Sequence, residues 1–200
     1  MIVILDNGHG NNTPGKRSPN GVLREYAYTR EIAKLVKEKL ENEHGVKTIL
    51  LVPEEEDISL GERCRRANKI HAQNNCDTIL ISIHLNAAGN GVNWASGKGF
   101  EAYTYYGYSK SDILADCLYE AAEKYLPGVK MRTDLSDGDK DKEAGFYILK
   151  HTIMPAVLTE NLFQDNKEDY EFLLSPEGKE AIVGLHVQGI LDYINKIKEQ

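Results

Sequence analysis

Cysteine is scarce in this sequence: the chain has only three in 200 residues, and no two of them form a CxxC pair. Cys64, Cys76 and Cys117 are widely spaced. The sequence therefore predicts neither a thiolate zinc site nor a redox motif. Free thiols of this kind are typical of a chain that folds in a reducing cytoplasm.

Long hydrophobic runs are also missing. Apolar runs such as residues 2–5 are far shorter than the roughly 18 residues of a transmembrane helix, so we expect no membrane span. The first residues, MIVILD, contain neither the basic start nor the small-residue cleavage site of a signal peptide, and they predict a strand. We therefore expect synthesis in the cytoplasm, with an export route that the sequence leaves unknown.

A surplus of positive charge is absent too. Lysine and arginine number 24 against 31 aspartates and glutamates, which gives a formal net charge of −7. Because binding to nucleic acid requires a basic face, we expect no nucleic-acid partner. Hydrophobic residues make up 41% and charged residues 28%, which is ordinary for a globular domain. The length suits one core, and we predict a single domain over residues 1–200.

Short apolar segments alternate with helical patterns along the chain. The predicted strands cover residues 3–5, 48–52, 78–83, 99–106, 146–149 and 156–159. The predicted helices cover residues 25–40, 60–73, 112–125 and 176–197. Strands that alternate with helices form a parallel sheet with right-handed crossovers. The fold class is therefore α/β, with a mostly parallel sheet of about six strands and helices on both faces.

Polar residues gather where the predicted strands end. His9 follows the first strand, His84 follows the third, Glu160 follows the last, and Glu25 begins the first helix. Ligands of open α/β sheets bind beyond the carboxyl ends of the strands. Two histidines and one glutamate with an open position form a catalytic zinc arrangement, and a second glutamate can act as a proton shuttle. A single histidine at a strand end is more often structural. The prediction therefore depends on the occurrence of several such residues at neighbouring strand ends.

Two other motifs would predict a different kind of site. Residues 10–16 match the GxxxxGK pattern of a phosphate-binding loop, but Arg17 stands where serine or threonine is needed, and turn residues follow instead of a helix. We therefore expect no nucleotide site. No GxSxG sequence is present, so a serine-hydrolase elbow is not predicted.

Aspartates at alternate positions resemble the start of a calcium loop. These are Asp137, Asp139 and Asp141, but Lys142 stands where that loop requires glycine. We therefore interpret the stretch as a solvated loop. Because Leu135 is the one large apolar residue among residues 134–145, we expect this loop to be mobile and to lie near the cleft; the alternative is a plain surface loop far from the site.

Several segments in a fixed order match a known protein family. They are ILDNGHG (residues 4–10), LRE (23–25), SL (59–60) with Arg63 and AN (67–68), SIHLNA (82–87), GFE (99–101), FYIL (146–149) and PAVLTE (155–160). With these segments the chain resembles the zinc-dependent N-acetylmuramoyl-L-alanine amidases of the amidase 3 family. The resemblance spans nearly the whole chain.

The resemblance implies hydrolysis of the amide bond between N-acetylmuramic acid and L-alanine, with peptidoglycan as substrate and Zn²⁺ as cofactor. The family's zinc ligands fall on His9, Glu25 and His84, and its catalytic glutamate falls on Glu160. Weaker candidates lie beside this set. They are Asp6, which either orients a ligand imidazole or only ends its strand, Asn86, and Arg132 as a contact for substrate carboxylates.

Two departures from the family bear on regulation and substrate preference. Asn7 stands where the family usually has proline, and residues 86–99 are too few for the inhibitory helix that some members carry. Two rival functions stay open: another metal-dependent peptidoglycan peptidase, and a non-catalytic wall-binding module. The sequence indicates no partner protein and does not separate a phage lysin from a cellular wall hydrolase.

Overall fold

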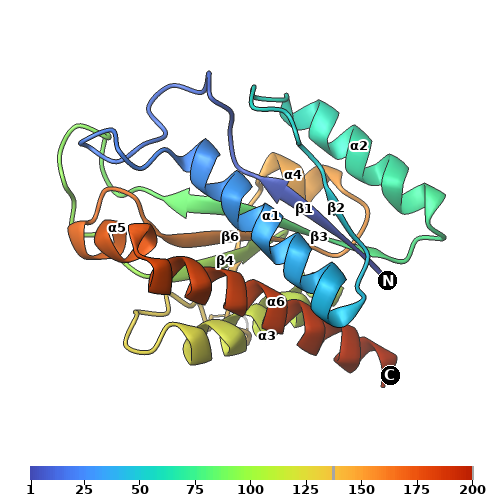
Figure 1. The fold of residues 1–200 in the computed structure, drawn as a ribbon. Coiled ribbons are helices and arrows are strands. Elements are labelled where there is room, and N and C mark those ends of the chain that lie inside the picture. Colours follow the sequence, from blue (N-terminus) through green and yellow to red (C-terminus); the bar gives the residue numbers. More distant parts are fainter. Residues whose placement is uncertain (137, 200) are drawn as a thin grey trace.

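The computed structural model describes residues 1–136 and 138–199, and its six strands form one sheet in the order β2–β1–β3–β6–β4–β5 (Figure 1). The strands are β1 (Ile2–Asn7), β2 (Thr48–Leu50), β3 (Thr78–Asn86), β4 (Phe100–Thr104), β5 (Lys142–Glu143) and β6 (Ala156–Phe163). The first three and β6 are mutually parallel, whereas β4 runs antiparallel to β6 and parallel to β5. The mostly parallel α/β sheet expected from the sequence is confirmed.

Helices cover both faces of the sheet (Figure 1). One face carries α1 (Glu25–His44), α3 (Lys110–Tyr125) and α6 (Pro176–Lys198); the other carries α2 (Leu60–Gln73) and α4 (Tyr147–His151). Successive side chains of a strand point to opposite faces. Val3 and Leu5 accordingly belong to the larger core under α1, α3 and α6, while Ile4 belongs to the smaller core under α2 and α4. The remaining helix, α5 (Lys167–Leu174), follows β6.

Helix ends follow from local sequence. Gly45 adopts a left-handed conformation with φ of 66° and caps α1 with a backbone hydrogen bond to Glu41. The Ser59 hydroxyl accepts a hydrogen bond from the backbone N–H of Glu62 at 3.3 Å and starts α2 where the sequence predicts it. Pro176 occupies the first turn of α6, where its missing N–H costs nothing.

The prediction of a strand over residues 146–149 is wrong. Phe146 is extended, but the next five residues form the short helix α4, which buries Ile148 and Leu149 in the smaller core. A four-residue apolar run suits either a strand or a buried helical turn, and only its packing decides between them. The sixth strand of the sheet is instead β5.

The loop before β5 is less exposed than the sequence predicts. Asp141 is buried with 1% of its surface exposed, so the interpretation of this stretch as a solvated loop is wrong at its C-terminal end. Asp137 lies outside the described residues.

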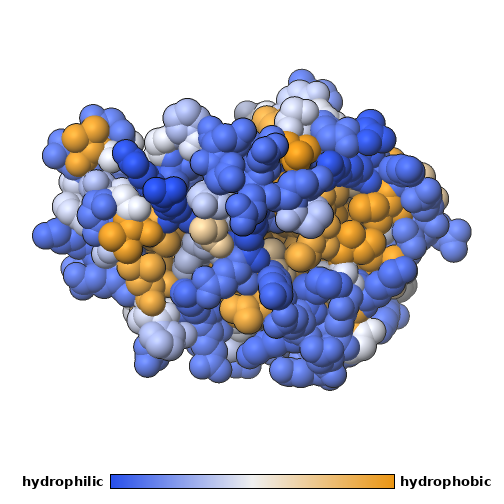
Figure 2. All heavy atoms as spheres, turned by 45° about the horizontal axis from the view of Figure 1, so that its top comes forward, coloured by the Kyte–Doolittle hydropathy of each residue, from blue (hydrophilic) through white to orange (hydrophobic). Residues whose placement is uncertain are grey.

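The outer surface matches the composition. Hydrophilic residues cover most of the face turned to the viewer in Figure 2, with hydrophobic residues in separate patches. In the described part of the chain, no helix has the length and apolar character of a membrane span. The three cysteines are free thiols, as expected.

Candidate functional site

The carboxyl ends of β1, β3 and β6 meet at one edge of the sheet. Asn7 of β1 lies opposite Ile83, and His84 of β3 lies opposite Glu160 of β6. His9 follows β1 by two residues, and Glu25 is the first residue of α1. The topology thus brings together the residues that the strand-end argument selected.

His9, Glu25 and His84 converge on one point. The Glu25 carboxylate oxygen Oε1 lies 3.2 Å from Nδ1 of His84 and 3.5 Å from Nε2 of His9. One ligand atom from each of the three side chains lies within 4.8 Å of the others. The two imidazole rings stand perpendicular, with centroids 5.2 Å apart. Two ring nitrogens and one carboxylate oxygen therefore form a compact set of metal donors.

Glu25 is held in place on both oxygens. Its side chain is only 1% exposed. Oε1 accepts a hydrogen bond from the backbone N–H of Leu85 at 3.1 Å, and Oε2 accepts one from Nε2 of Gln164 at 3.2 Å. Burial raises the pKa of Glu25, but the hydrogen bond with His84 and the charges of both imidazoles outweigh it, so the pKa is lowered overall. The carboxylate is therefore ionised and fixed in orientation.

The two histidines differ in protonation. Burial lowers the pKa of His9 to about 4, against a raising effect of Glu25. His9 is thus neutral at pH 7, with a ring nitrogen lone pair available to a metal. Burial also lowers the pKa of His84, but its hydrogen bond and charge interaction with Glu25 outweigh this and raise the pKa overall.

Glu160 lies beside the three donors without joining them. Its Oε2 atom is buried and has no hydrogen-bond partner among the described residues. Burial, reinforced by the charges of Glu25 and Glu101, raises the pKa of Glu160 to about 8, while His84 and Lys16 lower it. A carboxyl group with a free oxygen and a pKa near neutrality has the properties of a general acid–base.

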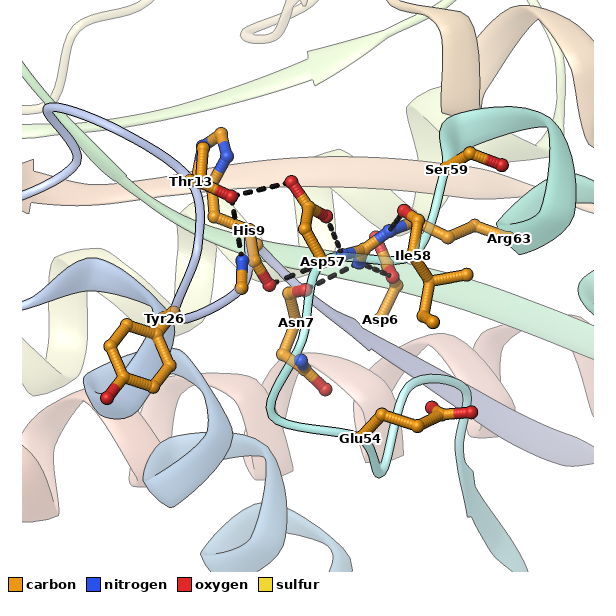
Figure 3. A network of polar contacts seen from close by, with 12 residues as sticks. Asp6, Asn7, His9, Thr13, Tyr26, Glu54, Asp57, Ile58, Ser59 and Arg63 are labelled. Atoms are coloured by element: carbon orange, nitrogen blue, oxygen red, sulfur yellow. Dashed lines mark hydrogen bonds and ion pairs between the residues drawn. The ribbon is translucent and has the colours of Figure 1, made fainter.

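Arg63 supports the loop that carries His9, and the sequence analysis did not select it as a site residue. The guanidinium, contributed by α2, points between Asp6 and Asp57 (Figure 3). Its Nη1 donates to Asp6 Oδ1 and to the carbonyl of Asn7, both at 2.6 Å. Its Nη2 donates to Asp57 Oδ1 at 2.9 Å and to the His9 carbonyl at 3.3 Å. One buried cation therefore holds the end of β1 and the backbone of a donor residue.

The backbone around His9 explains the flanking glycines. His9 has a φ of 59°, a region that non-glycine residues rarely adopt. A Cβ atom on Gly8 would lie 2.6 Å from the His84 ring, and one on Gly10 would lie 2.0 Å from the backbone of Asp57. Only glycine fits at either position, so the glycine–histidine–glycine sequence is a requirement of this turn.

The three weaker candidates from the sequence form hydrogen bonds with residues around the donor set; they are Asp6, Asn86 and Arg132. Asp6 accepts hydrogen bonds from Arg63 and, at 2.6 Å, from the Ser82 hydroxyl, so it bears on His9 through Arg63. Asn86 and Arg132 both donate to the buried carboxylate of Glu101, the latter at 3.1 Å.

Glu101 itself lies beside Glu160. The two glutamates are opposite each other in the β4–β6 register, and Lys142 Nζ binds Glu101 at 2.5 Å. Burial raises the pKa of Glu101, but Lys142 and Arg132 outweigh it and lower the pKa overall. Glu101 was also missed as a site residue by the sequence analysis.

A cleft of about 470 Å³ opens at the site. Its polar lining includes His9, Lys16, His84 and Glu160. Its apolar lining consists of Ile58, Leu60, Phe146, Tyr147, Ile148 and Leu158. Residues 87–99, which connect β3 to β4, contain no helix. The expectation that no inhibitory helix follows β3 is confirmed.

Comparison with known proteins identifies the family. Residues 3–192 match the family model described as N-acetylmuramoyl-L-alanine amidase. The chain belongs to this amidase family. It is 33% identical over 99% of its length to the endolysin of Bacillus phage SPP1, covering 68% of that protein. It is also 33% identical over 98% of its length to the N-acetylmuramoyl-L-alanine amidase CwlM of Bacillus licheniformis, covering 70% of it.

A solved structure agrees with the fold. The N-acetylmuramoyl-L-alanine amidase of Clostridium difficile 630 superposes with a TM-score of 0.83 at 27% identity, covering 98% of this chain and 97% of that one. The resemblance inferred from the sequence motifs is confirmed, and the chain is an amidase of this family.

Proposed function

We propose that this chain is a zinc-dependent N-acetylmuramoyl-L-alanine amidase that acts on bacterial peptidoglycan through His9, Glu25, His84 and Glu160. The amidase activity follows from the family; the zinc and the residue roles are our assignment. The observation that carries it is the convergence of three donor atoms within 4.8 Å beside a carboxyl group with an unpartnered oxygen. We further propose that residues 1–200 are one catalytic domain.

The donor set fits zinc. Catalytic zinc sites combine three protein ligands with an open position, and imidazole and carboxylate are among their usual ligands. His9 is neutral, Glu25 is ionised, and neither oxygen of Glu25 is paired with lysine or arginine within the described residues. Zinc held there is a Lewis acid that polarises the scissile carbonyl and acidifies water.

Glu160 carries the proton transfer in this proposal. As carboxylate it accepts a proton from the attacking water, and as carboxylic acid it returns that proton to the leaving nitrogen of L-alanine. Its pKa near 8 leaves much of it protonated at pH 7 without a nearby cation. A cation held by His9, Glu25 and His84 favours the carboxylate form, so the donor set and the base depend on each other.

The two rivals from the sequence fit less well. A wall-binding module without activity has no use for an unpartnered, buried carboxyl group beside a donor set, because such a group costs stability. A peptidase would use the same groups on a different bond. Relatives named endolysin and amidase favour the amide bond next to the sugar. Their names also support a role as a lysin that acts on the cell wall.

The roles of the two glutamates can be separated by substitution. Glu25→Ala should weaken zinc binding by orders of magnitude, because it removes one of three ligands. Glu160→Gln should keep zinc and lose about 10²- to 10⁴-fold in turnover, because it removes only the proton acceptor. Zinc content and release of L-alanine amino termini from purified peptidoglycan are measured for both, with new reducing sugars as the counter-assay.

Glu43→Gln is the matched control, since Glu43 is exposed on the same helix as Glu25. Glu25→Gln repeats the ligand test with the side-chain shape retained, in case Glu25→Ala folds poorly. Zinc loss in Glu160→Gln with zinc retained in Glu25→Ala would mean that the roles are swapped. Full activity in both variants would place the site elsewhere.

A further inference from the structure

A second group of carboxylates lies at the opposite edge of the sheet from the candidate active site. Because β4 runs antiparallel to β6, its last residue, Thr104, lies near the amino end of β6. Asp112 in the first turn of α3 and the loop residues Asp139 and Asp141 gather there. One carboxylate oxygen from each of the three aspartates lies within 4.8 Å of the others. These three residues are called the aspartate trio below.

Two members of the trio are removed from water. Asp112 is 2% exposed, Asp141 is 1% exposed, and the adjoining Thr104 is fully buried. The Thr104 hydroxyl donates to Asp141 Oδ2 at 2.7 Å, and the backbone N–H of Ser109 donates to Asp112 Oδ2 at 2.5 Å. The other oxygen of Asp141, Oδ1, is buried without a hydrogen-bond partner among the described residues. An oxygen in that condition requires a ligand or a proton.

The charges of the two buried members, Asp112 and Asp141, are not balanced by a basic side chain within the described residues. Across residues 1–136 and 138–199, no lysine, arginine or histidine forms an ion pair with Asp112 or Asp141. The two lysines nearest in sequence are engaged elsewhere: Lys140 binds Glu123 at 2.9 Å, and Lys142 binds Glu101 at 2.5 Å. Burial and the charges of Asp139 and Asp112 raise the pKa of Asp141 to about 7, against the Thr104 hydrogen bond. Buried carboxylates this close stay ionised together only around a cation.

We propose that Asp112, Asp139 and Asp141 form a second cation site, distinct from the candidate zinc site, and that Ca²⁺ is its ion. Oxygen-only donors are the ligands of Ca²⁺ and Mg²⁺ rather than of zinc. Two oxygens bound to one Ca²⁺ ion lie up to about 5 Å apart, which matches the spread of the trio without rearrangement. Mg²⁺ requires a tighter octahedral shell and so fits the trio less well.

The site ties three elements together, and one of them leads back to the candidate active site. Asp112 belongs to α3, Thr104 ends β4, and Asp141 immediately precedes β5. The next residue, Lys142, binds Glu101, which lies opposite Glu160 in the sheet. A bound Ca²⁺ therefore fixes the segment from which Lys142 reaches the neighbour of the proposed base.

Calcium binding is measured on the full chain loaded with one equivalent of zinc in metal-depleted buffer. Calorimetric titration should show one site with a Kd of about 10⁻⁴ to 10⁻³ M, the range of extracellular calcium modules. Calcium at 10 mM should raise Tm by about 3–10 °C, and Mg²⁺ should raise it less.

Matched variants locate the site. Asp141→Asn and Asp139→Asn should each abolish the calcium-dependent rise in Tm, whereas Asp134→Asn, an exposed aspartate of the same loop, should keep it. Glu25→Gln should also keep it, because Glu25 belongs to the other site. The proposal would be overturned if the wild type did not bind calcium at 10 mM. It would also be overturned if Asp139→Asn and Asp141→Asn bound calcium as well as the wild type does. Loss of calcium binding in Glu25→Gln would overturn it as well.

Discussion

Asp6 and Asp141 are equally buried but sit in opposite electrostatic surroundings. Asp6 is 2% exposed and lies 2.6 Å from the Arg63 guanidinium, with the Ser82 hydroxyl on its other oxygen. Asp141 is 1% exposed and has the Thr104 hydroxyl on one oxygen and two further aspartates nearby. A side-chain cation thus balances the first carboxylate within the fold, whereas the second depends on a proton or a bound ion.

The difference separates a structural buried charge from a functional one. A compensated carboxylate such as Asp6 serves to position its neighbours, here the backbone of His9 through Arg63. An uncompensated carboxylate such as Asp141 takes up a proton or binds a cation, depending on the pH and the ions in solution. Burial alone therefore does not distinguish the two roles, but the partners of the carboxylate do.

Removing Arg63 should make Asp6 resemble Asp141 and gives the largest expected effect. Arg63→Ala leaves the buried Asp6 unpaired and should lower the free energy of unfolding by about 3–5 kcal/mol. It should also weaken zinc binding about 10- to 100-fold, because the His9 carbonyl loses a donor. Urea unfolding and zinc titration measure the two effects.

Two further variants sharpen this test. Asp6→Asn in the Arg63→Ala background should recover part of the lost stability, because it removes the unpaired charge. Arg65→Ala is the control, since Arg65 lies exposed on the same helix and pairs only with Glu62 in the described chain. A stability loss below 1 kcal/mol in Arg63→Ala would contradict the view of Asp6 as a compensated charge.

The pH dependence of stability should reveal the opposite behaviour of Asp141. The unfolded chain releases the Asp141 proton near pH 3.8, whereas the folded protein keeps it to about pH 7. Between these values the folded state binds more protons, so the contribution of this group to stability falls as pH rises from about 4 to about 7 and is level above. Urea unfolding from pH 5 to 8 in calcium-free buffer should show a steeper fall of stability in the wild type than in Asp141→Asn, which keeps the slope that Glu160 contributes. Equal slopes in the two proteins would show that Asp141 titrates normally.

Deleting one hydroxyl from each region gives the smallest expected effects. Ser82→Ala should cost about 1 kcal/mol, because Asp6 keeps Arg63 when the hydroxyl is lost. Thr104→Val should lower the free energy of unfolding by about 2 kcal/mol without calcium, because no basic side chain in the described residues pairs with Asp141 once the hydroxyl is lost. Thermal unfolding with and without calcium measures both, and the reverse order of costs would contradict the comparison.

Strong periodic patterns made most of the fold predictable. The buried strands β1 and β3 and the long helices α1 and α6 are readable because their apolar spacing repeats over several residues. Short elements are different. Lys142 and Glu143 have no preference for a strand, and β5 exists because their backbone pairs with β4. Residues 147–151 are helical because tertiary packing overrides the ambiguity of a short apolar run.

The candidate site was predictable where it depends on topology. His9, His84 and Glu160 follow parallel strands, and those strand ends must meet at one edge of the sheet. The role of Arg63 was not predicted, because its pairing with Asp6 joins residues 57 positions apart. A signal did exist: Arg63 lies four residues before Ala67 on the buried face of α2, where an arginine requires a buried acidic partner. The aspartate trio was missed because the calcium-loop pattern places all its ligands in one segment, whereas Asp112 comes from a distant helix.

The order and length of the strands also affect how readily the sheets of two molecules pair at their edges. The two edge strands are the shortest, with three residues in β2 and two in β5, whereas the interior strands β3 and β6 have nine and eight. An exposed edge is a template for pairing with another chain, and very short edges blunt it. Proline at position 53, soon after β2, removes one more backbone donor from that side. The sheet therefore offers a second copy little backbone to add to, which protects the protein against strand-mediated aggregation at high concentration.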